Sequence, residues 1–497
     1  MSLIEAKNTN ARSSHDMVTS MMERFDDDAS VQRAWASIPL ADRVAVLQRA
    51  RHIFAECVTD LCEAIPSQLA RNAADTMCAE ILPLLAAMKF LESEAEIILA
   101  PRKLGRRGRP IWLMGVWSEV QHVPLGRVLV IAPSNYPLFL PGVQVLQALV
   151  AGNSVVWKPG RGGRAVATLC AAVLREAGLP DGLFRVTDES VAAAEGAMAS
   201  GVDKVFFTGS AASGKAVLRQ LAETLTPCVA ELSGCDAVFV LPSGDLSRVV
   251  KALAFGMRLN GSATCMAPRR VILVGATAGR SEEFVGMLLH ALDGIEGVSL
   301  PGAVRQELQL AVDDAWLQGA QVHGKVDAER QQPIVISDVT PEMLAARIDI
   351  FAPILAVLEA RNTQDAITMN EACPYALTAA VFGDEREALG LAAKITAGTV
   401  IVNDLMVPAA DPRTPFGGRR SSGFGTTQGA EGLLEMTAVK TIAVRRGRST
   451  NHYETTTPKH QRLFRGILDA SHLSSWRQRV AALKQVLSAA NDLRKKN

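Results

Sequence analysis

The segment LNGSATCMAPRR, residues 259–270, places one cysteine in a short polar loop between two apolar stretches. A cysteine in such a loop can act as a nucleophile, because its thiolate adds readily to a carbonyl carbon. A free cysteine is more usually a small buried hydrophobe, and the chain has seven others. Cys265 is therefore a candidate nucleophile only if other residues supply an oxyanion site and a base.

The remaining cysteine and histidine residues show no metal-binding pattern. The sequence contains no CxxC pair, no zinc-finger spacing and no HxxxH or HExxH motif, so we expect no metal site. Residues 1–17 lack an apolar segment of signal-peptide length, and no apolar run is long enough to span a membrane. We therefore expect free thiols in a reducing cytoplasmic compartment.

Three polar segments each follow an apolar, strand-like run: APSNYP, WKPG and FTGSAASG. In open parallel sheets, ligands bind beyond the carboxyl ends of the strands. Gly209 and Gly214 flank a predicted helix start, where backbone N–H groups can bind a phosphate. Neither GxGxxG nor a Walker motif is present. Three such loops in one series nevertheless favour nucleotide binding over ordinary turns.

The elements that must position these loops follow from the apolar patterning. Residues 29–100 have helical periodicity, and a basic segment and an arm-like stretch follow up to residue 123. From residue 127, solid apolar runs alternate with helical patterns, which is typical of βαβ units in a buried parallel sheet. A second such series begins at residue 236. With 497 residues, the chain is long enough for two α/β domains.

Eight features occur in a fixed order along the chain. They are SNYP, KP, FTGS, ELSG, a cysteine 34 positions after the Glu of ELSG, FAP, TVIVN and PFGGRRSSGFG. In this order and spacing they resemble the aldehyde dehydrogenase superfamily over about residues 30–445. The Glu231-to-Cys265 spacing and the PFGG segment are the most specific features.

The resemblance implies an α/β fold with two Rossmann-type domains and a β-arm for oligomerisation, to which this chain adds a C-terminal helical tail. The dinucleotide-binding domain would comprise residues 26–106 and 124–233, and the catalytic domain residues 234–425. The arm would comprise residues 107–123 and 426–446, and the basic C-terminal extension residues 447–497. We expect a homodimer or homotetramer.

The resemblance also implies three catalytic roles. Cys265 would add to an aldehyde carbon, and the Asn135 side-chain amide with the Cys265 N–H would hold the resulting oxyanion. After hydride transfer, Glu231 would activate the water that hydrolyses the Cys265 thioester. Each residue has a plainer alternative. Asn135 could be a turn residue before Tyr136, and Glu231 a strand-end carboxylate.

The cofactor implied is NAD or NADP. Its binding residues would be Lys158, Arg161, Thr208, Gly209, Ser210, Gly214, Asp349 and Phe351. Lys158 would contact ribose hydroxyls, and Asp349, one methylene shorter than the family's usual Glu, the nicotinamide ribose. The family usually has an acidic residue at the position of Arg161. A guanidinium there can pair with a 2′-phosphate, which favours NADP, unless Arg161 points into solvent.

The substrate would be a small-molecule aldehyde. The family's pocket positions correspond to Tyr136, Phe139, Val143, Thr264, Met266, Leu405 and Met406. They are mostly apolar and include no Arg or Lys to bind a carboxylate, which favours an uncharged aliphatic or aromatic aldehyde. Cys235, close to the predicted base, is either a core filler, which we favour, or a second thiol that can oxidise with Cys265.

Two other functions remain open. One is a coenzyme-A-dependent acyl reductase, which Glu231 argues against, because such relatives often lack this residue. The other is a non-catalytic scaffold acting through the basic tail.

The tail differs from the rest of the chain in charge. Residues 445–497 contain twelve Lys and Arg and three acidic residues, whereas the whole chain has a net charge of only +1, so we expect no nucleic-acid binding. Residues 460–470 and 476–490 carry helix-spaced apolar residues. Such a segment can lie on an anionic membrane. We favour instead a helix packed on the body or on a neighbouring subunit.

Overall fold

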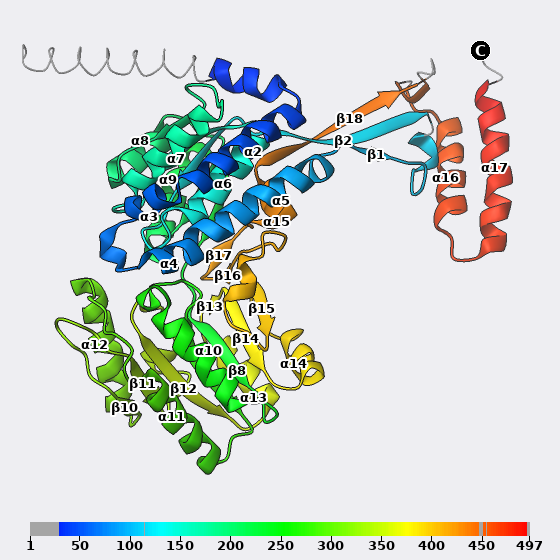
Figure 1. The fold of residues 1–497 in the computed structure, drawn as a ribbon. Coiled ribbons are helices and arrows are strands. Elements are labelled where there is room, and N and C mark those ends of the chain that lie inside the picture. The colour runs from blue at the N-terminus through cyan, green and yellow to red at the C-terminus, as the bar shows by residue number, and fades with distance from the viewer. Residues whose placement is uncertain (1–28, 114, 447–450, 454, 495–497) are drawn as a thin grey trace, which may run out of the picture. The chain divides into compact units, whose positions relative to one another are not determined.

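The structure is a computed structural model and describes residues 29–113, 115–446, 451–453 and 455–494. The polar N-terminal segment and the start of the predicted C-terminal extension lie outside these residues. The chain divides into two compact units, Met1–Arg102 with Val120–Lys440 and Lys103–Glu119 with Thr441–Asn497. Figure 1 shows the elements of both units.

The first sheet of the larger unit has the strand order β17-β7-β6-β3-β4-β5. Its strands are β3 (Arg127–Ile131), β4 (Ser154–Lys158), β5 (Phe184–Val186), β6 (Lys204–Thr208), β7 (Cys228–Glu231) and β17 (Gly423–Phe424). The helices that alternate with them are α6 (Phe139–Val150), α7 (Arg164–Glu176), α8 (Val191–Ala199) and α9 (Ala211–Thr224). All neighbouring strands are parallel except β17, which is antiparallel to β7. The register pairs Ile131 with Lys158 and Thr208 with Glu231, so these strand ends share one edge.

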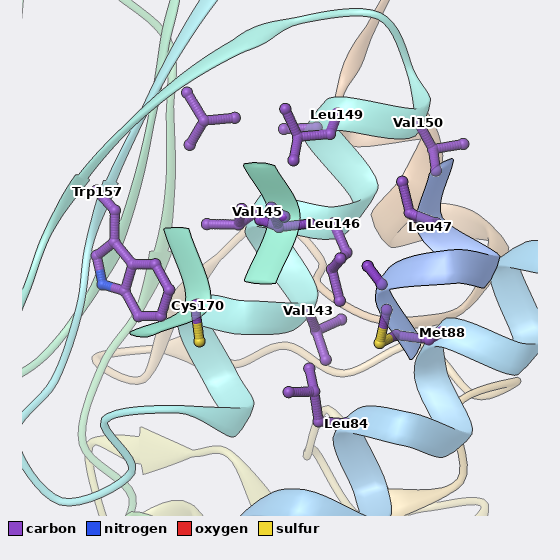
Figure 2. Close-up of a cluster of buried hydrophobic side chains, with 14 of the residues drawn as sticks. Leu47, Leu84, Met88, Val143, Val145, Leu146, Leu149, Val150, Trp157 and Cys170 are labelled. Carbon is purple, nitrogen blue, oxygen red and sulfur yellow. The ribbon is translucent and has the colours of Figure 1, made fainter. Parts of the chain in front are cut away.

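Helix α6 is the centre of the core on one face of this sheet. Its apolar side chains lie between those of α2 (Leu40–Glu56) and α5 (Leu82–Ile98) and those of β4 and α7 (Figure 2). Each fully buried aliphatic side chain of this kind contributes roughly 1.5–3 kcal/mol relative to exposure. This burial explains why the α6 sequence is apolar on almost every side.

The helices before the first sheet include one irregular turn. Short helices α3 (Val58–Ala64) and α4 (Ala73–Thr76) lead into a π-helical turn, Met77–Ile81, which continues directly into α5. Such π-turns often occur at functional sites. This one carries Glu80, which is fully buried.

The second sheet has the order β10-β11-β12-β9-β8-β14-β15. Its strands are β8 (Asp236–Val240), β9 (Pro268–Val274), β10 (Gln321–His323), β11 (Ile334–Ser337), β12 (Ile354–Ala360), β14 (Thr378–Phe382) and β15 (Thr399–Val402). The associated helices are α10 (Leu246–Arg258), α11 (Ala278–Leu292), α12 (Gly302–Leu317), α13 (Thr363–Glu371) and α14 (Glu385–Ala392). The pairings are parallel except at β10. Two parallel sheets in one chain confirm the predicted α/β fold.

Smaller elements complete the chain. Strands β13 (Tyr375–Ala376) and β16 (Arg419–Arg420) pair with each other, and α15 (Gly429–Glu435) follows. A three-stranded sheet has the order β1-β2-β18, with β1 (Arg102–Leu104), β2 (Val116–Pro124) and β18 (Thr437–Arg445).

The tail forms a helical hairpin of α16 (Pro458–His472) and α17 (Trp476–Arg494), which pack against each other (Figure 1). The predicted C-terminal helices are therefore present. Among the described residues, no helix is both long and apolar enough to cross a bilayer.

Candidate active site

Glu231 is the last residue of β7 and lies next to the end of β6. Its carboxylate is buried and accepts hydrogen bonds from the Thr208 hydroxyl, at 3.3 Å, and from the Thr427 hydroxyl. Burial raises the pKa of Glu231 to about 7, although both hydroxyl groups act to lower it. The carboxyl group is therefore divided between its protonated and ionised forms at neutral pH, which suits a general base.

The loop before Cys265 has an unusual backbone. Asn260, Gly261 and Ser262 all have left-handed conformations, with φ of 52°, 58° and 63°. Cys265 follows and is half-buried, and with Met266 it packs against a small apolar cluster. The cluster consists of Leu377, Ala409 and Phe416. The thiol therefore has an apolar wall beside it.

The environment of Cys265 favours the neutral thiol. Burial raises the pKa of the Cys265 thiol, and the charges of Glu231, Asp236 and Asp349 raise it further. Among these charges, that of Glu231 acts most strongly on the thiol. The two side chains are thus close enough to be electrostatically coupled.

Asn135 is directed at the same loop. Its side-chain nitrogen donates to the carbonyl oxygen of Ala263 at 2.9 Å, and the side chain of Asn260 donates to that oxygen at the same distance. A side-chain amide carries two N–H hydrogens, so the second one of Asn135 can serve another acceptor. The structure therefore brings together Asn135, Glu231 and the Cys265 loop.

A buried arginine that the sequence analysis missed joins these loops. Arg71 forms an ion pair of 2.6 Å with Glu80, and both side chains are almost fully buried. Its guanidinium also donates to the Asn260 side chain at 2.9 Å and to the Asn135 carbonyl at 2.5 Å. Glu80 in turn accepts the Phe139 N–H at 2.7 Å, at the start of α6. The only sequence signal for this cluster is one Glu within the apolar run of residues 77–88.

A second buried arginine, Arg269, was also missed. It donates to the Ser262 hydroxyl at 2.7 Å and to the Ser262 carbonyl at 2.8 Å. It forms an ion pair of 3.0 Å with Asp349 and lies 6.0 Å from the centre of the Phe351 ring. Through these contacts, Arg269 holds the Cys265 loop against the segment that contains Asp349 and Phe351.

Asp349 was predicted to contact the nicotinamide ribose, but in the structure its carboxylate is buried in the ion pair with Arg269. Its side chain is only 1% exposed, so a ribose hydroxyl could reach it only if the residues packed around it moved. Burial raises the pKa of Asp349 to about 6 despite the opposing effect of Arg269. The direct contact with the nicotinamide ribose therefore stays a prediction.

Lys158, at the end of β4, and the loop that leads from it to α7 lie near acidic side chains. Lys158 is half-buried, and burial lowers its pKa while Glu189 and Asp188 act to raise it. Glu189 accepts the N–H groups of Gly162 and Arg164, at 2.8 and 2.9 Å, and so occupies the N-terminus of α7. The sequence analysis did not identify this carboxylate.

Arg161 is exposed at the same loop. Both of the alternatives considered for it, solvent exposure and a pairing with a 2′-phosphate, stay open.

The loop between β6 and α9 is closely packed. Ser210 caps α9 by accepting the N–H of Ser213 at 3.2 Å. A Cβ atom on Gly214 would lie 2.7 Å from the Leu232 side chain, and one on Gly209 would lie 2.7 Å from the Phe207 ring. Because glycine has no Cβ, it avoids both clashes. The two glycines therefore allow the backbone of this loop to lie close to Phe207 and Leu232.

The predicted pocket residues fall into two groups. Tyr136 and Thr264 share a hydrogen bond of 3.1 Å between their hydroxyl groups, and Thr264 precedes Cys265. Phe139 and Val143 belong instead to the core around α6, and Leu405 and Met406 to the core beside α10. Of the predicted pocket set, Tyr136, Thr264 and Met266 thus lie nearest to the Cys265 loop.

Cys235 has a different neighbour from the one considered in the sequence analysis. Its thiol is buried and shares a hydrogen bond with the thiol of Cys373. The Arg270 side chain also donates to the Cys235 carbonyl at 2.9 Å. This packing agrees with the interpretation of Cys235 as a core residue.

Comparisons with known proteins show which family the chain belongs to. The aldehyde dehydrogenase family profile matches residues 8–442. The 4,4′-diapolycopene aldehyde oxidase of a Methylomonas species is 30% identical over 413 residues, which cover 80% of this chain and 77% of that protein. The succinate-semialdehyde dehydrogenase (NADP(+)) of Deinococcus radiodurans is 29% identical over 86% of this chain and 90% of its own length.

Solved structures show the same fold. The crystal structure of a Mycobacterium tuberculosis aldehyde dehydrogenase complexed with NAD+ superposes with a TM-score of 0.75 at 26% identity, covering 84% of this chain and 88% of that one. The family profile and the relative of 30% identity both span most of the sequence. The chain belongs to the aldehyde dehydrogenase family.

Proposed function

We propose that the protein oxidises an uncharged aldehyde to the carboxylic acid with NAD or NADP, through a thioester on Cys265 that water hydrolyses. The observation that carries this proposal is the electrostatic coupling of the half-buried Cys265 thiol to the buried carboxyl group of Glu231, whose pKa is about 7. The Asn135 amide, directed at the same loop, supplies the third component.

Formation of the first intermediate requires the thiol to lose its proton. Glu231, whose charge acts most strongly on the thiol, accepts this proton directly or through water. The sulfur then bonds to the aldehyde carbon while the carbonyl electron pair moves to oxygen. The second N–H of the Asn135 amide and the Cys265 backbone N–H stabilise the oxyanion.

Hydrolysis uses the same carboxylate again. The nicotinamide, when bound, would supply the hydride acceptor, and loss of hydride from the former aldehyde carbon would leave a thioester on Cys265. Glu231 first releases to solvent the proton it took from the thiol and, ionised again, takes a proton from water as the water oxygen bonds to the thioester carbon. The C–S bond breaks, the carboxylic acid leaves and Cys265 regains its proton. A buried base of this kind favours water over coenzyme A as the acyl acceptor.

The residues present fit a dinucleotide. The N-terminus of α9 would receive the pyrophosphate, because the group that caps it is the neutral Ser210 hydroxyl and not a carboxylate. Lys158 ends β4, which is separated from β6 by β3 in the same sheet, and would contact ribose hydroxyls. The N-terminus of α7 is less suited to a phosphate, since Glu189 already occupies its N–H groups.

Cofactor selection then depends on two opposing charges. Exposed Arg161 would attract a 2′-phosphate, and Glu189, which accepts the N–H of the next residue, Gly162, would repel one. The relatives named above include a protein named for NADP(+) and a structure complexed with NAD+. We infer that both cofactors are accepted, with a modest preference for NADP.

The substrate inference rests on the surroundings of Cys265. Its wall is apolar, and the two arginines that border the loop are each paired with a buried carboxylate. Neither guanidinium is positioned to bind a substrate carboxylate. We therefore expect an apolar aldehyde to be preferred over succinate semialdehyde, the substrate named for one relative.

A panel of aldehydes tests the proposal by following the reduced nicotinamide. It should contain aliphatic and aromatic aldehydes and succinate semialdehyde, each with NAD or NADP and with or without coenzyme A. The expected result is coenzyme-A-independent turnover that favours the apolar aldehydes. Turnover only in the presence of coenzyme A would establish the acyl-transfer reaction instead.

A homo-oligomer is the expected assembly. Strand β18 is an edge of its three-stranded sheet and exposes Val439, Ile442 and Val444. Exposed apolar residues on an edge strand favour pairing with another chain. Light scattering of the purified protein would give the number of subunits.

A further inference from the structure

Helix α17 carries an exposed apolar stripe. Trp476, Val480, Leu483 and Leu487 are spaced by four, three and four residues, which places them on one face of the helix. Each of them is between 46% and 69% exposed. On α16, Phe464 and Leu468 are one turn apart and also exposed, on the side of that helix opposite Gly466. We call the four residues of α17 the tail stripe.

The tail stripe is separate from the face that holds the hairpin together. Ala482 is buried and Val486 is half-buried on α17, and a Cβ atom added to Gly466 of α16 would lie 2.9 Å from the Val486 side chain. The two helices therefore pack closely through small residues. The apolar residues of the tail stripe are not needed for that contact, so another role must account for them.

Cationic side chains border the stripe on α17. Arg477 and Lys484 lie on one side of it and Arg479 on the other, as the 100° rotation per residue requires. The Arg477 guanidinium lies 5.8 Å from the Trp476 ring centre. Between residues 458 and 494 the chain has seven Lys and Arg and only two Asp, one of which, Asp469, is paired with Arg465.

We propose that the tail stripe docks the protein on the surface of an anionic lipid bilayer. An apolar helix face bordered by Arg and Lys inserts its side chains at the boundary of headgroups and acyl chains, while the cations remain at the level of the phosphates. Tryptophan is suited to the same depth. No helix is required to cross the bilayer, which agrees with the absence of a spanning helix among the described residues.

Charge favours a lipid surface over a second copy of the same hairpin. Two hairpins meeting through their stripes would bring two sets of Arg477, Arg479 and Lys484 together, and like charges in close contact are unfavourable. An anionic bilayer supplies the opposite charge to the same three residues. The proposal is independent of the reaction at Cys265.

Co-sedimentation of the full chain with vesicles tests the proposal. The probes are phosphatidylcholine vesicles and phosphatidylcholine vesicles containing phosphatidylglycerol. We expect binding to the anionic vesicles that weakens as salt is raised, and weak binding to the neutral ones. In V480E/L483E and in R477E/K484E, the partition coefficient should fall by at least about tenfold.

The matched control replaces two exposed apolar residues outside the hairpin by glutamate. Trp316 and Leu317 of α12 are 68% and 75% exposed, so W316E/L317E should bind vesicles as the unaltered chain does. All variants should keep their aldehyde-oxidising activity and thermal unfolding temperature, which shows that they fold. Brominated lipids should quench part of the tryptophan fluorescence, and W476F should lose that part.

Three results would overturn the proposal. They are equal binding to neutral and anionic vesicles, unchanged binding in V480E/L483E, and no vesicle binding by the unaltered chain. If V480E/L483E reduced the mass measured by light scattering while vesicle binding was absent, a second copy of the chain would be the partner instead.

Discussion

The two ends of the candidate site are built differently. Around Cys265, the loops are buried and held by Arg71 and Arg269, each of which is paired with a carboxylate. Around Arg161, the side chains are exposed, and a carboxylate occupies the neighbouring helix N-terminus. The reacting end is thus preorganised by the fold. At the cofactor end, surface charges can change without disturbing the core.

Removal of the nucleophile should show the largest effect. We expect Cys265→Ala to lower turnover by about 10⁴-fold or more, because no other group can form the thioester. Cys78 is exposed, so Cys78→Ala should leave turnover unchanged and is the matched control. Substantial turnover in Cys265→Ala would mean that the preorganised end does not contain the reacting thiol.

Replacement of the base should be the next largest effect. We expect Glu231→Gln to lower kcat by about 10²–10⁴-fold, and the acyl-enzyme should accumulate and be visible by mass spectrometry of the quenched protein. In the unaltered enzyme, kcat should rise with pH through about 7, as Glu231 loses its proton. A variant that kept this pH dependence would exclude Glu231 as its source.

The same substitution should increase stability. The pKa of Glu231 is raised in the folded chain, so its contribution to stability is fully present below its ordinary pKa and is lost as pH rises through about 7. Because glutamine does not ionise, we expect Glu231→Gln to be more stable than the unaltered chain at pH 8, by at most about 3 kcal/mol. Thermal unfolding at pH 5 and pH 8 would measure this difference, which should be small at pH 5.

The Arg71–Glu80 pair provides a sharper test of preorganisation. We expect Arg71→Met to lower the free energy of unfolding by about 3–5 kcal/mol, because it leaves the Glu80 carboxylate buried without its partner. The double variant R71M/E80Q should regain much of this stability but not the activity, because Asn135 and Asn260 still lack their shared donor. Chemical denaturation and kcat/KM would separate the two effects. Full recovery of activity in the double variant would show that the arginine only balances a charge.

The exposed end should give the smallest effects. We expect Arg161→Glu to lower the ratio of kcat/KM for NADP to that for NAD by about tenfold, and Glu189→Gln to raise it a few-fold. Values of kcat at saturating cofactor should change little. Arg175, exposed near the other end of α7, provides the control Arg175→Glu. A large loss of kcat in Arg161→Glu would remove the distinction between the two ends.

The parts of the site that the sequence could predict are those set by strand ends. Lys158, Thr208 and Glu231 end apolar runs that pair in parallel, so the pattern of the sheet places them at one edge. Arg71 and Arg269 could not be found in this way, because the contacts by which they join the loops, to Asn135 and Asn260 and to Asp349, connect segments that are 64–189 residues apart. Glu189 also remained unidentified, since nothing in the local pattern distinguishes a helix-capping carboxylate from a solvated one.

Asp349 shows a related limit. The motif that contains it identifies the segment, but its partner Arg269 lies 80 residues away along the chain. Residue type alone therefore could not show that its carboxylate would be buried.

The left-handed run at residues 260–262 has a consequence for folding order. A non-glycine residue in this backbone region is unfavourable by about 1 kcal/mol or more unless its surroundings hold it there. The contacts that hold Asn260 and Ser262 come from Arg71, 189 residues away, and from Arg269 at the start of a buried strand. The Cys265 loop can therefore reach its final shape only after the segments that carry Arg71 and Arg269 have packed against it. During refolding, the return of helical and sheet signals should precede the return of aldehyde oxidation, so the chain would pass through a folded but inactive stage.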